Sequence, residues 1–315
     1  MMRAARLTTP FLLLAVVVTL LKAPSPSAAA EPIFGFNDTA ETFAARAKAA
    51  KRAGSTVARI PVSWEVAEPL PGQFNWAWLD TAVAAVRERG IRPLFVLSAA
   101  PSWAAPNCNR TVTPTCAVGE GFEDYYVRVA LHLLQRYRGS QIQSWNEPNI
   151  AAFGSIAPQR VAQLTNALYR VAPKKVIGPG SSPGAPDFMR YTALAYKRIN
   201  PHVPMAFNCY PLTESGPGSL QIYWRRARAL AHGRPIWVTE IGFPVSTYGE
   251  SGQAELSAHA YRFLARHKAR AIIFHRLQDP LTAHDDWEAS LGLLRTDGAP
   301  KPAFHALRRA VFKHR

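Results

Sequence analysis

Two glutamates, Glu147 and Glu240, each lie where an apolar run gives way to a loop that contains proline. Glu147 belongs to the string WNEPN at 145–149, and Glu240 to the string WVTEIGFP at 237–244. Side chains at such positions leave the core and face a cleft. Two facing carboxylates are the minimal apparatus for breaking a glycosidic bond. The chemistry therefore depends on whether the rest of the chain brings these two side chains together.

The elements that must position the glutamates alternate regularly. Short apolar runs, expected to be strands, lie at 33–36, 57–62, 93–97, 142–145, 175–177, 205–209, 235–239 and 271–274, and amphipathic stretches of helical period lie at 40–53, 77–89, 122–138, 157–171, 186–199, 219–231, 252–268 and 302–312. This succession of strand-then-helix units predicts a single (β/α)8 TIM barrel. A doubly wound open sheet is the alternative, which the lack of a glycine-rich phosphate loop after the first run disfavours.

In such a barrel Glu147 ends the fourth strand and Glu240 ends the seventh. Both would project from the C-terminal face, where barrel active sites form. The Pro- and Gly-rich stretches 178–186 and 210–218 follow the fifth and sixth strands, so we interpret them as rim loops rather than domain boundaries. Residues 31–315 are therefore expected to form one catalytic domain.

Residues 1–30 have the order of a secretory signal peptide. Arg3 and Arg6 precede an apolar run at 11–21, and small residues end the segment before Glu31. The run is short for a membrane span, although an uncleaved anchor is the alternative reading. We therefore expect a secreted protein with no stable membrane insertion after cleavage.

The chain is strongly basic. Its formal net charge is +16, and it falls to +13 without residues 1–30, which hold two arginines and one lysine but no acid. Such an excess can attract anionic glycans or the cell envelope. Because the basic residues are scattered along the sequence, an arginine-rich compositional habit is the simpler explanation. No motif for binding nucleic acid is present.

Three cysteines are few, and in an exported protein two of them can pair. Cys108 and Cys116 bracket a short polar segment, so we expect a disulfide between them. Cys209 lies in an apolar run and is expected to be buried. No Cys/His cluster has the spacing of a zinc site, so we predict no metal and no cofactor.

Around the two glutamates the sequence resembles the retaining glycoside hydrolases of clan A, particularly families 5 and 39. The matching strings are Asn146-Glu147-Pro148 and Thr239-Glu240-Ile241-Gly242. Further similarity runs through Trp64, 68–76, 101–104 and 292–294, and so spans nearly the whole chain after residue 30. The resemblance implies that Glu147 is the acid/base and Glu240 the nucleophile. A structural ion pair with an arginine is the alternative for each glutamate.

The resemblance also implies roles for three neighbours. Arg59 would contact the nucleophile, the Tyr210 hydroxyl would be its second partner, and Asn146 would reach the sugar 2-hydroxyl. With this support Glu240 would stay ionised, while Glu147 would hold its proton. The plainer alternatives are that Arg59 is an ion-pair residue at the barrel mouth, that Tyr210 is an aromatic residue of the rim, and that Asn146 is a turn residue.

Several aromatic residues are candidates for contact with sugar rings. Trp64, Trp103 and Trp287 could stack on a pyranose face, with loop packing as the alternative. The chain departs from the family pattern in two places, because Asn208 replaces a common histidine and strand eight lacks the usual tryptophan. Phe274 or His275 would have to take its place, which leaves the identity of the sugar open.

These features predict a secreted, monomeric, retaining O-glycoside hydrolase that acts on a β-linked oligo- or polysaccharide. Two alternatives remain. One is a transglycosylase that uses the same covalent intermediate with a sugar acceptor, and the other is a catalytically weak carbohydrate-binding or cell-envelope protein on the same barrel.

Overall fold

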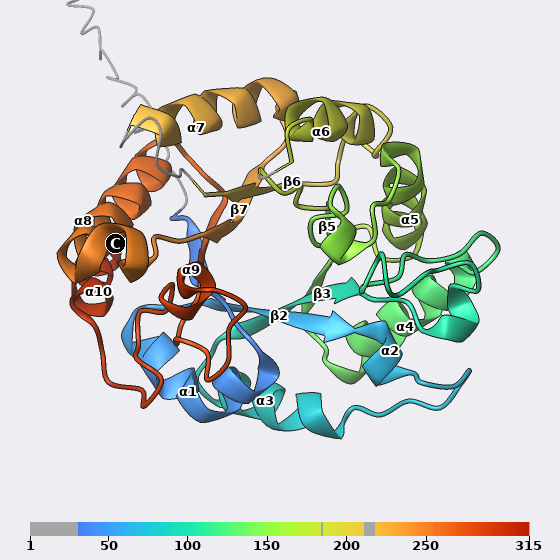
Figure 1. Cartoon of the computed structure of the whole chain (residues 1–315), viewed down its shortest axis with the longest axis horizontal. Coiled ribbons are helices and arrows are strands. Elements are labelled where there is room, and N and C mark those ends of the chain that lie inside the picture. The colour runs from blue at the N-terminus through green and yellow to red at the C-terminus, as the bar shows by residue number, and fades with distance from the viewer. Residues whose placement is uncertain (1–30, 184, 211–217, 315) are drawn as a thin grey trace, which may run out of the picture. The chain divides into compact units, whose positions relative to one another are not determined.

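The computed structural model describes residues 31–183, 185–210 and 218–314, and it contains a single (β/α)8 barrel, as predicted (Figure 1). Its parallel strands are β1 (Ile33–Asn37), β2 (Val57–Ser63), β3 (Arg92–Ser98), β4 (Gln141–Gln143), β5 (Val176–Ile177), β6 (Met205–Cys209), β7 (Ile236–Ile241) and β8 (Ala271–His275). Neighbours follow the order β5-β4-β3-β2-β1-β8-β7-β6. The first strand therefore pairs with the last.

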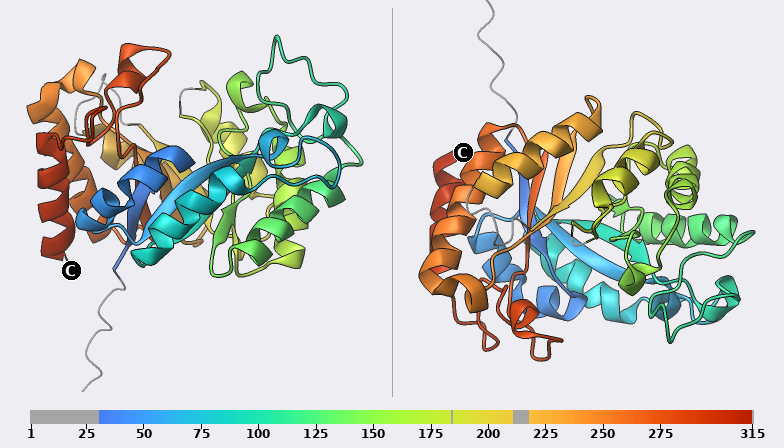
Figure 2. Two further views of the ribbon diagram at one scale, coloured as in Figure 1. Left: turned by 90° about the horizontal axis from the view of Figure 1, so that it is seen from below. Right: turned by 45° about the horizontal axis from the view of Figure 1, so that its top comes forward.

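The principal helices surround the strands and run antiparallel to them (Figure 1, Figure 2). They are α1 (Ala40–Arg52), α3 (Ala77–Glu88), α4 (Glu123–Arg136), α5 (Pro158–Val171), α6 (Phe188–Tyr196), α7 (Gly218–Ala231), α8 (Val245–Arg266) and α10 (Pro302–His314). All eight predicted helices are thus present, with ends shifted by a few residues.

Two apolar clusters hold the barrel together. A small one lies within the ring of strands, where Leu94, Trp237 and Ile273 meet. A much larger one lies between the strands and the helices and includes Phe34, Phe95 and Leu133. Because successive strand residues point to opposite faces, the nearly uninterrupted apolar runs fill both layers at once.

The ring is weakest between β5 and β6, where the described residues form no strand ladder. One backbone hydrogen bond crosses there, from Gly178 N to Pro204 O at 3.0 Å. The Tyr196 hydroxyl adds two more, because it donates to Pro179 O and accepts from Ala206 N, both at 2.9 Å. A side chain on Gly178 would collide with this hydroxyl, since a Cβ built there lies 2.4 Å from it. We call this junction between β5 and β6 the seam, and the Tyr196 side chain supplies most of the hydrogen bonds that close it.

Short elements interrupt the regular pattern at the C-terminal end of the barrel. They are α2 (Trp64–Ala67), α9 (Asp286–Ala289) and the 3₁₀ turns Ser102–Ala104 and Ala151–Phe153. Helix α8 begins at Val245 rather than near the predicted residue 252, but Gly249 takes a non-helical φ of 64° and separates a short first piece from the long regular part that follows. Each of these is too short, or too irregular, to show a helical period.

Residues 31–315 form one compact unit. The predicted signal peptide at 1–30 lies outside the described residues, as does most of the predicted loop 210–218. Within the described residues, no helix has the length and apolar character needed to cross a membrane.

Candidate active site

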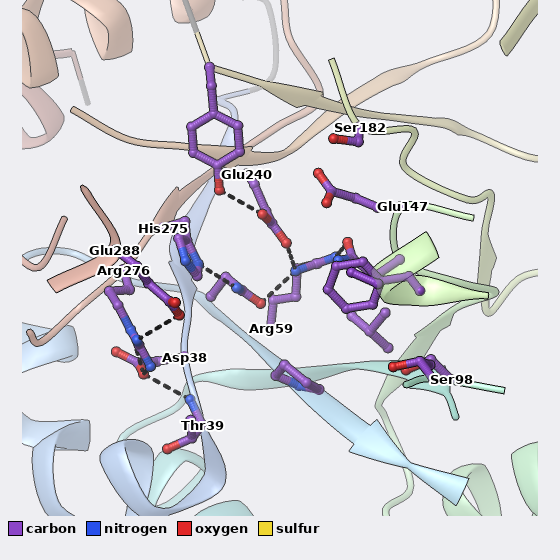
Figure 3. Close-up of a pocket in the computed structure, with 18 of the residues that line it drawn as sticks. Asp38, Thr39, Arg59, Ser98, Glu147, Ser182, Glu240, His275, Arg276 and Glu288 are labelled. Carbon is purple, nitrogen blue, oxygen red and sulfur yellow. Dashed lines mark hydrogen bonds and ion pairs between the residues drawn. The ribbon is translucent and has the colours of Figure 1, made fainter. Parts of the chain in front are cut away.

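The two glutamates singled out in the sequence share one cavity of about 1100 Å³ at the C-terminal end of the strands. Glu240 lies on β7, whereas Glu147 lies four residues beyond the end of β4, further out than predicted. Their carboxylates point into the same space (Figure 3). Arg59, Asn146, Tyr210, His275 and Trp287 also line this cavity. The structure therefore brings together most of the predicted site residues.

Glu240 is held as a carboxylate by two strong donors. Arg59 Nη1 donates to Oε1 and the Tyr210 hydroxyl donates to Oε2, each at 2.6 Å. Glu240 is 6% exposed. Burial alone would raise the pKa of Glu240, but the Arg59 charge, helped by the Tyr210 hydroxyl, outweighs it and holds this pKa below its ordinary value. Glu240 is therefore ionised at neutral pH.

Glu147 has the opposite environment. Burial, followed by repulsion from Glu240, raises the pKa of Glu147 to about 7, although a hydrogen bond of 3.1 Å from Asn208 Nδ2 and another from Ser182 oppose the rise. No cation forms an ion pair with it among the described residues. Near neutral pH, Glu147 can therefore carry a proton while Glu240 does not.

The backbone at Glu147 is strained in a way that aims its side chain. Its φ is +41°, in the left-handed region that favours glycine. The conformation is held by hydrogen bonds on both sides of the residue, from Glu147 N to Gly180 O at 2.7 Å and from Ile150 N to Glu147 O at 3.2 Å. A left-handed residue other than glycine at a cavity is a recurrent mark of a functional site.

Arg59 organises the floor of the cavity. Besides Glu240, it donates from Nε to Gln143, from Nη1 to Asn37 Oδ1 at 2.5 Å and from Nη2 to Asn146 Oδ1 at 2.8 Å. A guanidinium can only donate, so it fixes which end of each amide it meets. The Asn146 amide nitrogen must therefore point away from Arg59, and Asn146 lines the cavity.

The same logic extends from Asn37 to His275. Because Asn37 Oδ1 faces Arg59, its nitrogen is the atom that lies 2.7 Å from His275 Nδ1. Nδ1 must then accept, which places the single proton of a neutral imidazole on Nε2. Burial lowers the pKa of His275, in keeping with the neutral ring. His275 therefore presents an N–H donor at the place where the sequence pattern suggested an aromatic floor.

Three of the predicted sugar-contacting residues do not reach the cavity. Trp64 is fully buried and donates from Nε1 to Glu68 at 2.8 Å. Trp103 packs edge-on against Trp64, with ring centroids 5.4 Å apart, and Phe274 is 1% exposed and packs against Phe34. These predictions were wrong because apolar packing satisfies each ring. Trp287 does line the cavity, and its centroid lies 5.1 Å from that of Tyr210.

The structure also assigns site positions to residues that the sequence reasoning missed. Asn37 and Asp38 follow the first apolar run, and Ser182 follows the fifth, so their places just past strands were a usable signal. Asp38 is a buried carboxylate that pairs with Arg276 at 3.0 Å (Figure 3). It also accepts hydrogen bonds from the backbone N–H groups of Leu277 and Gln278. This cluster ties the end of β1 to the segment after β8.

The predicted disulfide between Cys108 and Cys116 is present. The loop that it closes contributes Pro114 and Thr115 to the cavity wall. Cys209 is buried and free, also as predicted, and burial raises the pKa of its thiol. Among the residues that the structure describes, no group of three or more His, Cys, Asp or Glu side chains is placed to hold a metal ion.

Comparisons with known proteins agree with the resemblance drawn from the sequence. A family model described as beta-galactosidase, of glycoside hydrolase family 42, matches residues 36–111. This segment runs from β1 into the loop after β3. A search of curated proteins finds no significant match.

Solved structures of glycoside hydrolases share the fold. A family 39 glycoside hydrolase from Bacteroides cellulosilyticus WH2 superposes with a TM-score of 0.67 and 21% identity over 89% of this chain, which spans 64% of that structure's length. A GH5_18 protein from Streptomyces cattleya in complex with Manβ1-4GlcNAc superposes with a TM-score of 0.68 and 20% identity. The match covers 90% of this chain and 81% of that protein. An exo-β-1,4-mannosidase from Opitutaceae bacterium strain TAV5 superposes with a TM-score of 0.67 and 17% identity. The match covers 90% of this chain and 59% of that protein.

Proposed function

We propose that this protein is a retaining glycoside hydrolase that cleaves a β-linked glycan by double displacement, with Glu240 as the nucleophile and Glu147 as the acid/base. The observation that carries the proposal is that two carboxylates in one cavity have pKa values shifted in opposite directions. Arg59 and Tyr210 hold Glu240 ionised, whereas burial and repulsion keep a proton on Glu147. A nucleophile beside a proton donor is what the first step of this reaction requires.

In the first step, a Glu240 oxygen attacks the anomeric carbon while Glu147 gives its proton to the departing glycosidic oxygen. The products are a glycosyl ester of Glu240 and a free alcohol. The outward-facing amide of Asn146 can donate to the sugar 2-hydroxyl, a contact that strengthens as positive charge develops on the ring.

The second step reverses the role of Glu147. Esterification removes the negative charge of Glu240, and with it the repulsion that helps to raise the pKa of Glu147. Glu147 then ionises more readily, takes a proton from water, and directs the resulting hydroxide to the anomeric carbon. Bond cleavage frees Glu240, and the sugar leaves with its original anomeric configuration.

The recognition groups favour a neutral, hydroxyl-rich sugar. His275 offers an N–H donor, and the partly exposed ring of Trp287 offers an apolar wall. The charges of Arg59 and Arg276 are already matched by Glu240 and Asp38. Among the described residues that line the cavity, no arginine or lysine is therefore left without a carboxylate partner to select a carboxylated sugar.

The test is hydrolysis of an aryl β-glycoside panel by the protein beginning at Glu31. Because the similar structures include a mannosidase and a GH5_18 protein, and the matching family model is described as beta-galactosidase, the panel should contain mannosides, galactosides, glucosides, xylosides and N-acetylglucosaminides. We expect turnover of at least one substrate with retained configuration, read by proton NMR of the first product. Inversion would contradict the proposal.

Two variants assign the roles of the glutamates. Glu147→Ala should lower turnover by roughly 10²–10⁴-fold, the range for loss of general acid–base catalysis. Added azide should then yield the β-glycosyl azide, because it intercepts the ester of Glu240. Glu240→Ala should be at least as impaired, and azide should yield the α-anomer by direct attack. Exchanged outcomes would reverse the assignment.

The same assay separates hydrolysis from transfer. Adding a sugar acceptor should leave free sugar as the main product of a hydrolase. A main product that carries the acceptor would instead identify a transglycosylase. Tight sugar binding without any turnover would support the carbohydrate-binding alternative.

We also propose that the protein is exported and cleaved before Glu31. Support comes from the order of basic, apolar and small residues at 1–30, and from the disulfide between Cys108 and Cys116, since disulfides persist in oxidising compartments. N-terminal sequencing of the protein from culture medium tests the cleavage site.

A further inference from the structure

The end of the barrel opposite the cavity carries a concentration of exposed cations. In the last helical turns and the loops leading into the next strand, every connection contributes at least one exposed lysine or arginine. They are Lys51, Arg52, Arg87, Arg92, Arg136, Arg138, Arg170, Lys174, Lys175, Lys197, Arg198, Arg228, Arg266, Lys268 and Arg270. We call this set the basic face. Residues scattered along the sequence are thus collected in space by the barrel topology.

Acids are nearly missing from the same region. In those helix ends and loops, all of which lie in the described part of the chain, Glu88 is the sole acid, and it pairs with Arg89. One further exposed acid, Glu31, lies at this end just before β1. Arg136 reaches Asp80, but no other member of the basic face forms an ion pair with a described residue. Most other described acids lie in the loops at the cavity end or the first halves of the helices. The positive charge of the basic face is therefore largely uncompensated.

Helix dipoles account for only part of this distribution. A cation in the last turn of a helix is stabilised by the partial negative charge there, which explains Lys51, Arg87 or Arg266. It does not explain Arg92, Arg138, Lys174 or Lys268, which lie beyond the helix ends in loops or at the start of a strand. These residues are exposed, and none of them forms an ion pair with a described residue.

We propose that the basic face docks the protein on an anionic phospholipid bilayer. The cations are spread around the whole ring rather than along a line, which matches a plane of negative charge better than a single polyanionic strand. Each lysine or arginine near such a surface contributes to attraction that fades within a Debye length. Val171 and Phe312, 47% and 48% exposed, lie at the same end and can enter the headgroup region.

The course of the chain supports this orientation. β1 begins at the basic face and ends at Asn37, which lines the cavity, so the two lie at opposite ends of the strands. Figure 2 places the C-terminal end of α10 at the same end of the barrel and the long loop after β3 at the other. Docking would turn the cavity away from the membrane, toward glycans outside it.

The test measures co-sedimentation of the protein beginning at Glu31 with vesicles of phosphatidylcholine, with and without 30% phosphatidylglycerol, at about 0.1 M salt. Binding is expected only to the anionic vesicles and should be lost at high salt. The triple variant Arg138→Gln, Lys174→Gln and Lys268→Gln should bind about a hundredfold more weakly, since each cation contributes about fivefold.

A matched control removes three exposed cations from the outer helix surfaces, through Lys48→Gln, Arg190→Gln and Arg225→Gln. It has the same net charge and should lose only a few-fold in binding. Equal losses in the two triple variants would show that net charge alone acts, and would overturn the proposal. So would failure to bind anionic vesicles, or binding to a carboxylated polysaccharide such as alginate in place of vesicles. Both triple variants should retain turnover, so the result is independent of the proposed enzymatic function.

Discussion

At the scale of single residues, Arg59 determines the chemistry of the cavity because it can only donate hydrogen bonds. It fixes the charge on Glu240, and it sets the direction of the Asn37 and Asn146 amides. Through Asn37 it also selects the tautomer of His275. One buried cation thus orders a carboxylate, which we propose to be the nucleophile, and two hydrogen-bond donors that face the cavity.

The pKa shifts predict a bell-shaped pH dependence of kcat/KM. Activity should fall above pH about 7 as Glu147 loses its proton, and at low pH as Glu240 gains one below its ordinary range. In Glu147→Gln, assayed with a dinitrophenyl glycoside whose leaving group needs no proton, the fall on the basic side should disappear. Steady-state rates from pH 3 to 9 provide the measurement. A basic limb that persists in this variant would exclude Glu147 as its source.

Glu147 should also make stability depend on pH. Its pKa is about 7 in the folded protein, above the ordinary value of 4.5. The proton-bound form therefore stabilises the fold below pH about 4.5, and this contribution is lost as pH rises through about 7. Glu147→Gln should exceed the wild type in unfolding free energy at pH 8 by up to about 3 kcal/mol, and by little at pH 4. Urea unfolding at both pH values tests this.

His275 should discriminate among substrates through its Nε2–H. His275→Phe removes the donor and should lower kcat/KM about tenfold, the value of one hydrogen bond, whereas His275→Gln should retain more activity. Repeating the comparison with monodeoxy substrates will show which hydroxyl is contacted, because its removal should abolish the difference between the variants. Equal losses on every deoxy substrate would leave His275 with a packing role only.

At the scale of elements, β5 and β6 differ from the other neighbouring strands in having a tyrosine hydroxyl in place of a ladder. The last residues before the cavity depend on this region, because Glu147 N donates to Gly180 O just beyond β5. Gly180 must stay small, since a Cβ there would lie 2.8 Å from Asn208 Oδ1 and 3.0 Å from Thr239 Oγ1. Seam and site are thus structurally linked.

Tyr196→Phe should destabilise the protein more than a similar change elsewhere. It leaves Pro179 O and Ala206 N without their partner and should cost about 1–3 kcal/mol. Tyr191→Phe is the control, because it removes a single buried hydrogen bond, to Ile156 O, outside the seam. Chemical denaturation and amide exchange at Ala206 are the measurements. If the two variants were equally stable, the seam would not depend on Tyr196.

The elements were also the most predictable part of the molecule. Apolar runs and helical periods were sufficient to place all eight strands and their helices, because each run fills both layers of the barrel. The sequence could not reveal that β4 ends at Gln143. The chain leaves the sheet before Glu147, whose backbone is left-handed, and no glycine at that position indicated this conformation. Trp64 and Phe274 were misassigned because a ring near a strand end can face the core as readily as the cavity.

At the scale of the whole molecule, charge is polarised along the barrel axis. The cavity end holds most of the acids, including Asp38, Glu147 and Glu240, and the opposite end holds the basic face. Because residues 31–315 form one compact unit, both ends of this polarity belong to the same domain. The proposed docking at one end therefore leaves the proposed catalytic site at the other end accessible.

Residues 1–30 should be dispensable for folding. A protein beginning at Glu31 should unfold in one cooperative transition, with the same midpoint as the full chain of residues 1–315, because residues 31–315 form a compact unit of their own. Thermal unfolding in oxidising buffer checks this. A lower midpoint than that of the full chain would mean that residues 1–30 contribute to the stability of the folded state.

The pairing of β1 with β8 has a consequence for how the protein is made. Asp38 accepts hydrogen bonds from Arg276, which lies 238 residues later, so the ring can close only after nearly the entire polypeptide is available. Contacts this distant in sequence form slowly. If the chain is exported as we propose, this delay would keep it unfolded while it is threaded through a translocation pore, and the ring would close on the far side.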